Sequence, residues 1–240
     1  MTPLGNIRIK LFMDGADLQQ MASFAAMPHI KGFTTNPTLL RKSGISDYRS
    51  FAKEALKHAG ALPVSFEVLA NDFTAMEKEA RLIASWGKHS FVKIPITNSL
   101  GESSLPLIRT LSHEGIALNI TAIMTIGQVK SVAAVLNPNA PSVVSVFAGR
   151  IADTGRDPVP VMRESAAILA SNKNAELLWA SPRELLNIFH AESCGTHIIT
   201  ATSEILNKLS LVGKNLDEFS LETVAMFRRD TLAAGLQLLN

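Results

Sequence analysis

Short apolar runs rich in β-branched and aromatic residues recur along the chain and alternate with segments of helical periodicity. Such runs predict strands. The expected strands are Ile7–Met13, Gly32–Thr35, Val64–Val68, Phe91–Ile94, Ala117–Ile120, Val143–Phe147, Leu177–Ala180 and His197–Thr200. Strands that alternate with helices favour a parallel sheet, and eight of them favour closure. The pattern therefore predicts an α/β fold, a (β/α)₈ TIM barrel.

The segments between the strands carry apolar residues at helical spacing. Met76, Ala80 and Ile83 recur in this way after Asp72, a residue type that caps helices. The expected helices include Asp47–His58, Asp72–Trp86 and Pro158–Ala170, with two more after the last strand, Asp217–Phe227 and Asp230–Leu239. No linker or charge block divides the chain, so we expect one domain over residues 1–240 with extra C-terminal helices.

Polar residues interrupt the predicted strands on one face only. Side chains alternate along a strand, so Val92 and Ile94 face the helices while Lys93 faces the barrel interior. The same rule turns inward Asp14, Thr34, Asn36, Ser65, Glu67, Asn119, Thr121, Ser145 and Ser181, the last sharing its parity with Trp179. Most lie toward the C-terminal ends of their strands, which is where barrel active sites are built.

Composition narrows the class of protein. The 240 residues include 23 Lys and Arg against 21 Asp and Glu, a net charge of +2, and no basic run suggests a nucleic-acid partner. No stretch reaches the roughly 18 consecutive apolar residues of a membrane span. The single cysteine, Cys194, and the lack of a signal-peptide pattern predict a cytoplasmic protein. The six histidines have no metal-ligand spacing, so we expect no metal.

Lys93 is the candidate nucleophile. Burial inside a barrel disfavours an ammonium ion and favours the neutral amine, which attacks carbonyl carbon. The resulting Schiff base turns a ketone into an electron sink and permits cleavage of the adjacent C–C bond. The alternative is structural: Lys93 extends to the barrel rim or pairs with an acid such as Glu67.

Schiff-base chemistry also needs proton carriers and contacts to a polyhydroxylated substrate. Asp14 and Glu67 are two inward carboxylates whose environments can separate an acid from a base. Thr121 is placed to hold a catalytic water against Glu67. Asn36 and Asn119 suit substrate hydroxyls, although each alone is more often a loop-capping residue.

Two Ser/Arg pairs follow consecutive strands and suit an anion. Ser145 and Arg150 flank the sixth strand end, and Ser181 and Arg183 flank the seventh. Phosphate sites in barrels draw on late loops, and arginine binds phosphate in a bidentate way. The alternative for each arginine is a surface salt bridge.

Six blocks of sequence resemble the successive signatures of the transaldolase family, and in particular of the small transaldolases and fructose-6-phosphate aldolases. They are Phe12–Asp14, Gly32–Thr38, Val92–Pro95, Asn119–Thr121, Ser145–Ile151 and Ala180–Arg183. The resemblance implies a (β/α)₈ barrel without a cofactor, acting on sugar phosphates. The implied reaction moves a dihydroxyacetone unit from a ketose phosphate to an aldose phosphate in the pentose phosphate pathway.

The resemblance also implies a role for each matching position. Lys93 corresponds to the Schiff-base lysine, Asp14 to the carboxylate that works in C–C cleavage, and Glu67 with Thr121 to the holders of the catalytic water. The substrate-binding positions are Thr34, Asn36, Asn119, Ser145 and Phe147, and the phosphate-binding positions are Arg150, Ser181 and Arg183.

Glu67 and Phe147 favour a transferase over a lyase. The family's fructose-6-phosphate aldolases tend toward Gln and Tyr at these positions, and a tyrosine hydroxyl could help to release free dihydroxyacetone. An aldolase-like lyase and a non-catalytic sugar-phosphate-binding barrel remain the alternatives. The chain departs from the family pattern at Pro182 and at Ala201, which bear on the phosphate loop and the eighth strand.

Leu232, Leu236 and Leu239 lie at helical spacing in the tail and suggest an assembly surface. Small transaldolases form rings of subunits, so we expect a homo-oligomer. A terminal helix packed on its own barrel would give the same pattern.

Overall fold

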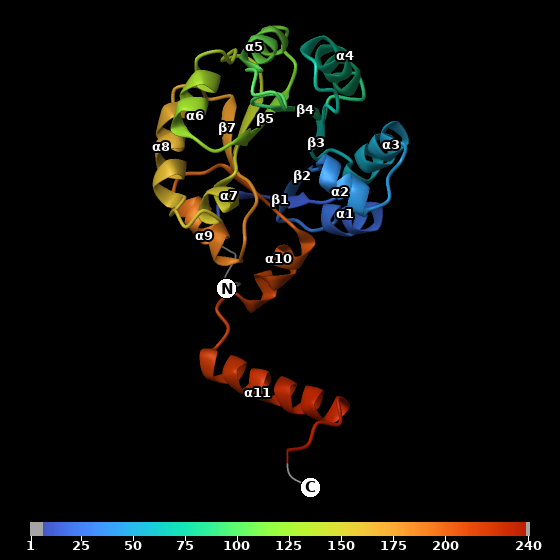
Figure 1. Cartoon of the computed structure of the whole chain (residues 1–240), viewed down its shortest axis with the longest axis vertical. Coiled ribbons are helices and arrows are strands. Elements are labelled where there is room, and N and C mark those ends of the chain that lie inside the picture. The colour runs from blue at the N-terminus through green and yellow to red at the C-terminus, as the bar shows by residue number, and fades with distance from the viewer. Residues whose placement is uncertain (1–6, 239–240) are drawn as a thin grey trace. The chain divides into compact units, whose positions relative to one another are not determined.

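The computed structural model describes residues 7–238, and eight parallel strands within it close into a barrel in chain order (Figure 1). Each strand pairs with the next, and β8 pairs with β1. The strands are β1 Lys10–Asp14, β2 Ile30–Thr34, β3 Val64–Glu67, β4 Ser90–Pro95, β5 Leu118–Ile123, β6 Ser142–Val146, β7 Ala175–Trp179 and β8 Ile198–Ala201. The predicted (β/α)₈ barrel is confirmed.

Helices connect the strands and surround them on the outside of the barrel (Figure 1). They are α1 Leu18–Ala25, α2 Pro37–Lys42, α3 Tyr48–Ala59, α4 Phe73–Ala84, α5 Leu105–His113, α6 Ile126–Ala133, α7 Ala148–Ala152, α8 Val159–Leu169, α9 Leu186–Ser193 and α10 Ser203–Asn207. None of the helices among residues 7–238 has the length and apolar run that a membrane span needs.

Side-chain caps begin several of these helices directly after a strand or loop. The carboxylates of Asp17, Asp47 and Asp72 accept hydrogen bonds from backbone N–H groups in the first turns of α1, α3 and α4. Thr125 and Gln128 form a reciprocal capping box at α6. Such caps satisfy N–H groups that have no partner within the helix, so each helix starts at a defined residue.

The strand parity predicted from the sequence is correct for the helix-facing layer of β3, β4 and β5. Phe66, Val92, Ile94 and Ile120 are fully buried. The opposite parity faces the barrel interior, where an apolar cluster is formed by Phe12, Val143, Leu178, Ala180 and Ile198, with Phe91 and Phe147 packed against it. This cluster supports the polar residues at the C-terminal mouth.

Two strand boundaries differ from the prediction by three residues, and the others differ by two or fewer. β1 begins at Lys10 rather than Ile7. β5 continues to Ile123, past the expected end at Ile120, and its register with β6 shifts between these two residues. Ala122 lies within the shift at a φ of 61°. A bulge of this kind re-aims side chains beside it, and polarity alone does not reveal it.

Residues 208–238 belong to a second compact unit. It contains the short helix η1, Lys208–Leu211, and α11, Leu216–Ala233. The two predicted tail helices are wrong: they are one helix, because nothing that breaks a helix occurs before Gly235, whose φ is 63°. Leu239 lies outside the described residues. The expectation of one domain over residues 1–240 stays a prediction.

Candidate active site

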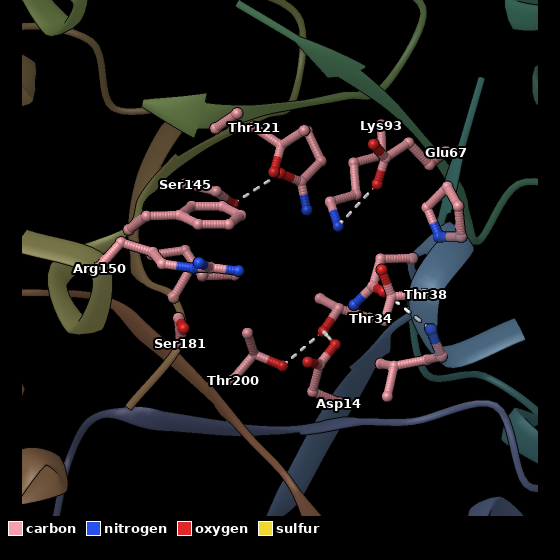
Figure 2. Close-up of a pocket in the computed structure, with 18 residues that line it drawn as sticks. Asp14, Thr34, Thr38, Glu67, Lys93, Thr121, Ser145, Arg150, Ser181 and Thr200 are labelled. Carbon is pink, nitrogen blue, oxygen red and sulfur yellow. Dashed lines mark hydrogen bonds and ion pairs between the residues drawn. The ribbon is translucent and has the colours of Figure 1, made fainter. Parts of the chain in front are cut away.

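A cavity of about 450 Å³ opens at the C-terminal ends of the strands (Figure 2). Eleven of the twelve site residues expected from the sequence lie in its wall, together with Pro37, Thr38, Leu39, Ala122, Leu178, Ala180 and Thr200. The eleven are Asp14, Thr34, Asn36, Glu67, Lys93, Asn119, Thr121, Ser145, Phe147, Arg150 and Ser181. Arg183 is the exception. The convergence predicted from strand parity is therefore present in three dimensions.

Lys93 lies on β4 with only 6% of its surface exposed. Its Nζ is 3.0 Å from Oε2 of Glu67 and donates to the backbone oxygen of Thr35 at 3.0 Å. The register of β3 and β4 sets Glu67 directly beside Lys93. The pairing that was the structural alternative for Lys93 is thus present, and it lies inside the cavity, where the carboxylate is also within reach of a proton on the amine.

Asp14 ends β1 and faces the same cavity. Burial raises the pKa of its carboxyl above the ordinary value, against the opposing effects of the Lys93 charge and a hydrogen bond from Thr34, while the Glu67 charge raises it further. Thr34 Oγ1 donates to Asp14 Oδ1 at 2.7 Å, and the two residues are register partners on β1 and β2. A carboxyl in a cleft with a pKa raised by burial is a candidate for proton transfer.

Asn119 is fully buried and its amide is fixed on both sides. Ser145 Oγ donates to Asn119 Oδ1 at 2.7 Å, and Asn119 Nδ2 donates to Ser65 Oγ at 3.0 Å. An amide nitrogen carries two hydrogens. The second N–H of Asn119 is therefore held in one orientation and remains available for a ligand in the cavity.

Asn36 and Thr121 each have a side-chain group that can form a further hydrogen bond. Asn36 caps α2, since its side-chain oxygen accepts from Leu39 N at 3.0 Å, and its Nδ2 group is left for the cavity. The capping alternative is thus correct and compatible with binding. The buried Thr121 hydroxyl has no hydrogen-bond partner among residues 7–238. A buried hydroxyl without a partner is costly, and a ligand in the cavity would satisfy it.

Ser181 reaches the cavity for a reason other than the expected one. Strand parity placed Ser181 and Trp179 on the inward face, but Trp179 is 1% exposed and lies outside the wall, while Leu178 and Ala180 line it. Ser181 follows the end of β7 with a φ of 61°. This left-handed conformation is unfavourable for serine, and it turns the residue back toward the cavity. Strain of this kind is typical of functional sites.

The two predicted phosphate-binding arginines lie in different surroundings. Arg150, on α7, is part of the cavity wall. Arg183 forms a bidentate ion pair with Asp153: Nε donates to Oδ1 at 2.8 Å and Nη2 donates to Oδ2. The Arg183 guanidinium lowers the pKa of Asp153 through this hydrogen bonding. The salt-bridge alternative is therefore present for Arg183, whereas Arg150 forms no ion pair with any residue from 7 to 238.

Gly149 allows α7 to begin against the Ser181 loop. Its N–H donates to Ala180 O at 3.3 Å, and a Cβ placed on Gly149 would lie 1.5 Å from the backbone oxygen of Ser181. We expect Gly149→Ala to lower the free energy of unfolding by about 2–4 kcal/mol, because backbone cannot yield as a side chain can. Urea denaturation measures the change.

The matched control is Gly127→Ala in α6, where an added Cβ would meet only Thr125 Oγ1 at 3.9 Å. Because alanine favours a helix over glycine, this variant is expected to gain about 0.5–1 kcal/mol. Equal effects of the two substitutions would contradict the close approach at Gly149.

Thr38 and Thr200 belong to the wall but were not among the expected site residues. Thr38 lies in the first turn of α2, where strand parity has no bearing. Thr200 occupies the C-terminal half of β8 and could have been found by extending the parity rule to the eighth strand. Across residues 7–238, no three His, Cys, Asp or Glu side chains come together as metal ligands, and the expectation of no metal stays a prediction.

Solved structures with related geometry share the fold. The crystal structure of dihydrodipicolinate synthase from Rhodopseudomonas palustris matches with a TM-score of 0.57 at 16% identity, covering 96% of this chain and 81% of the other. A dihydrodipicolinate synthase family protein from Coccidioides immitis matches with a TM-score of 0.61 at 13% identity, covering 97% and 80%. At this identity the likeness concerns the fold alone.

Comparison of sequences identifies the family, which the likeness in fold alone does not. The chain is 34% identical over 203 residues to a probable transaldolase of Methanococcus maripaludis, covering 84% of this chain and 89% of the relative. It is 31% identical over 232 residues to a probable transaldolase of a Thermoanaerobacter species, covering 96% and 100%. The model of the transaldolase/fructose-6-phosphate aldolase family matches residues 11–237. With its barrel and the residues gathered at the mouth, the chain belongs to the transaldolase/fructose-6-phosphate aldolase family.

Proposed function

We propose that the chain is a transaldolase. It would move a dihydroxyacetone unit from a ketose phosphate, such as fructose 6-phosphate or sedoheptulose 7-phosphate, to an aldose phosphate through a Schiff base on Lys93. The observation that carries the proposal is a lysine only 6% exposed, at the mouth of a barrel, with a carboxylate 3.0 Å from its nitrogen. Membership of the family supports the same class of reaction.

The first step joins the enzyme to its substrate. In the proposed mechanism, Glu67 takes a proton from the Lys93 ammonium, and the neutral amine bonds to the C2 carbonyl carbon of the ketose. The carbonyl oxygen then leaves as water after protonation, which gives an iminium ion. Glu67 lies within reach of the nitrogen, and the Thr121 hydroxyl is available to hold that water.

The second step breaks the C–C bond. The C4 hydroxyl gives its proton to Asp14 as the C3–C4 bond breaks, and the electron pair moves to the iminium nitrogen. An aldose phosphate leaves and an enamine of dihydroxyacetone stays on Lys93. The raised pKa of Asp14 supports this role, because a carboxylate with a raised pKa is a stronger base than an ordinary one.

Polar groups around the nucleophile suit the dihydroxyacetone unit. In the proposal, the fixed N–H of Asn119 and the free amide nitrogen of Asn36 donate to substrate hydroxyls. Ser145 orients Asn119 at 2.7 Å, and Thr34 orients Asp14 at 2.7 Å. Holding the reacting groups in one geometry is itself a large part of catalysis.

The phosphate group is assigned to Arg150, Ser181 and Arg183. Arg150 and Ser181 lie in the cavity wall on the side of β6 and β7. Arg183 would have to exchange its bond to Asp153 for one to the substrate. The proposal therefore gives Arg150 the larger part in phosphate binding.

Phe147 supports transfer over simple cleavage. Its ring lies in the cavity wall and carries no hydroxyl to deliver a proton to the enamine, so the bound fragment would wait for an acceptor aldehyde. Glu67, rather than glutamine, stands beside Lys93. A fructose-6-phosphate aldolase-like lyase would use the same nucleophile but would release free dihydroxyacetone.

The test is acceptor dependence. The protein is given fructose 6-phosphate with and without erythrose 4-phosphate, and glyceraldehyde 3-phosphate and sedoheptulose 7-phosphate are measured. We expect continuous turnover with the acceptor and about one equivalent of product per site without it. Sustained dihydroxyacetone release without acceptor would favour the lyase. No product and no adduct after borohydride treatment would favour a non-catalytic binding barrel.

The proposal also covers the pathway, the compartment and the oligomeric state of the enzyme. We place it in the pentose phosphate pathway of the cytoplasm, working without a cofactor and as a homo-oligomer. The single cysteine, Cys194, is buried and free, which is compatible with a reducing compartment. Leu232 and Leu236 are 62% and 68% exposed, which is compatible with an assembly surface.

A further inference from the structure

Three side-chain oxygen atoms form a continuous chain across three adjacent strands at the mouth of the barrel (Figure 2). Thr34 Oγ1, on β2, lies 2.7 Å from Asp14 Oδ1 on β1 and 2.5 Å from Thr200 Oγ1 on β8. Thr34 and Thr200 are 2% and 5% exposed. All three residues line the cavity. Thr200 is the end of the chain farthest from the carboxylate.

The number of protons fixes the direction of these bonds. A hydroxyl has one hydrogen to donate. Thr34 uses its hydrogen for the Asp14 carboxylate, so the contact of 2.5 Å must be one in which Thr200 donates to Thr34. When Asp14 takes up a proton, the order reverses: Asp14 donates to Thr34, and Thr34 donates to Thr200. The chain can therefore follow the charge of Asp14 without any movement of heavy atoms.

From this arrangement we infer that Thr200 is a positioning residue, which acts through Thr34 to orient the Asp14 carboxylate and to stabilise its ionised form. The inference rests on the proposed function, in which Asp14 is the base of C–C cleavage. Donation from Thr200 polarises the Thr34 hydroxyl and makes it a stronger donor to the carboxylate. Thr200 itself has no proposed contact with the reacting atoms.

The charges around Asp14 come from other strands. Lys93 on β4 lowers the pKa of Asp14, and Glu67 on β3 raises it. Toward Asp14, β2 and β8 present the two threonine hydroxyls. The helix α10 packs on β1 and β8 and carries Glu204. Removal of the Thr200 hydroxyl would therefore leave the charges in place and alter only the hydrogen-bond chain.

Thr200→Val tests the inference, because valine keeps the shape of threonine and cannot donate. In a plot of kcat for ketose cleavage against pH, the acidic limb is expected to move to higher pH by about half a unit to one unit. A shift of this size corresponds to the loss of one ordinary hydrogen bond to the ionised carboxylate. KM and the yield of the borohydride adduct on Lys93 should stay unchanged. Thr200→Ser, which keeps the donor, should restore the limb to its original position.

The matched control is Thr196→Val, just before β8, where a buried hydroxyl has no partner in the described part of the chain. Its profile should not move. Should Thr200→Val not fold, Thr200→Cys, a weak donor of similar size, is expected to give an intermediate shift. An unmoved limb in a folded Thr200→Val or Thr200→Cys protein that still forms the adduct overturns the inference. No adduct in the unaltered protein overturns the proposed function instead.

Discussion

Replacing Lys93 with methionine is expected to abolish the adduct that borohydride traps with fructose 6-phosphate and to lower kcat by about 10⁴-fold or more, as loss of a covalent nucleophile does. Methionine fills similar space but cannot form an imine. Mass spectrometry of the reduced protein measures the adduct and locates it. An adduct that persists in Lys93→Met would mean that another lysine is the nucleophile.

Two further variants make this result interpretable. Lys93→Met leaves Glu67 without its cation, and breaking a buried pair in this way can cost about 3–5 kcal/mol of stability. The double variant Lys93→Met, Glu67→Gln removes both charges, so a folded and inactive double variant separates chemistry from stability. Lys130→Met is the control, because Lys130 forms an exposed ion pair with Glu164 on the helical layer. It should keep both adduct and activity.

Asp14→Asn is expected to separate imine formation from bond cleavage. Loss of a general base typically costs about 10²–10⁴-fold, and asparagine cannot take the proton of the C4 hydroxyl. Lys93 and Glu67 stay in place, so borohydride should still trap the protein with the intact ketose. Trapped mass distinguishes the uncleaved sugar from the dihydroxyacetone fragment. A variant that still cleaves at the original rate would contradict the role of Asp14.

The same substitution has a predicted effect on stability. The pKa of Asp14 is raised in the folded protein, so the folded state binds the proton more tightly than the unfolded state. The contribution of this group to stability is then greatest below its unfolded pKa and falls as the pH rises through the folded value. At neutral pH Asp14→Asn removes a carboxyl whose ionisation is disfavoured by burial in the folded protein, so the melting temperature of the variant should rise. At a pH below about 4, the difference in melting temperature between Asp14→Asn and the unaltered protein should be smaller.

The barrel and most of the site were predictable because both depend on a local rule. Inward parity and position near a strand end placed Glu67, Lys93, Asn119 and Ser145 together without knowledge of any contact. The rule fails where the backbone leaves a regular strand. Ser181 enters the cavity through a left-handed turn instead.

Features that depend on distant partners could not be predicted. A salt bridge at Arg183 was an alternative open from the sequence, but the choice of Asp153, 30 residues earlier, as its partner was not predictable. The parity rule extended to β8 would place Thr200 in the cavity wall, but it would not reveal the contact with the hydroxyl of Thr34, 166 residues away in sequence. In the tail, sequence periodicity suggested two helices where the backbone continues as α11.

The Asp153–Arg183 pair has a consequence for how the enzyme would tell its substrates apart. For Arg183, phosphate binding is an exchange of one anion for another and not the addition of a new ion pair. The number of ion pairs that Arg183 makes does not change on binding, so the net gain from this residue is small. Discrimination against sugars without phosphate then depends mainly on Arg150. We expect it to be modest and only weakly sensitive to salt, which would leave the enzyme tolerant of unphosphorylated acceptor aldehydes.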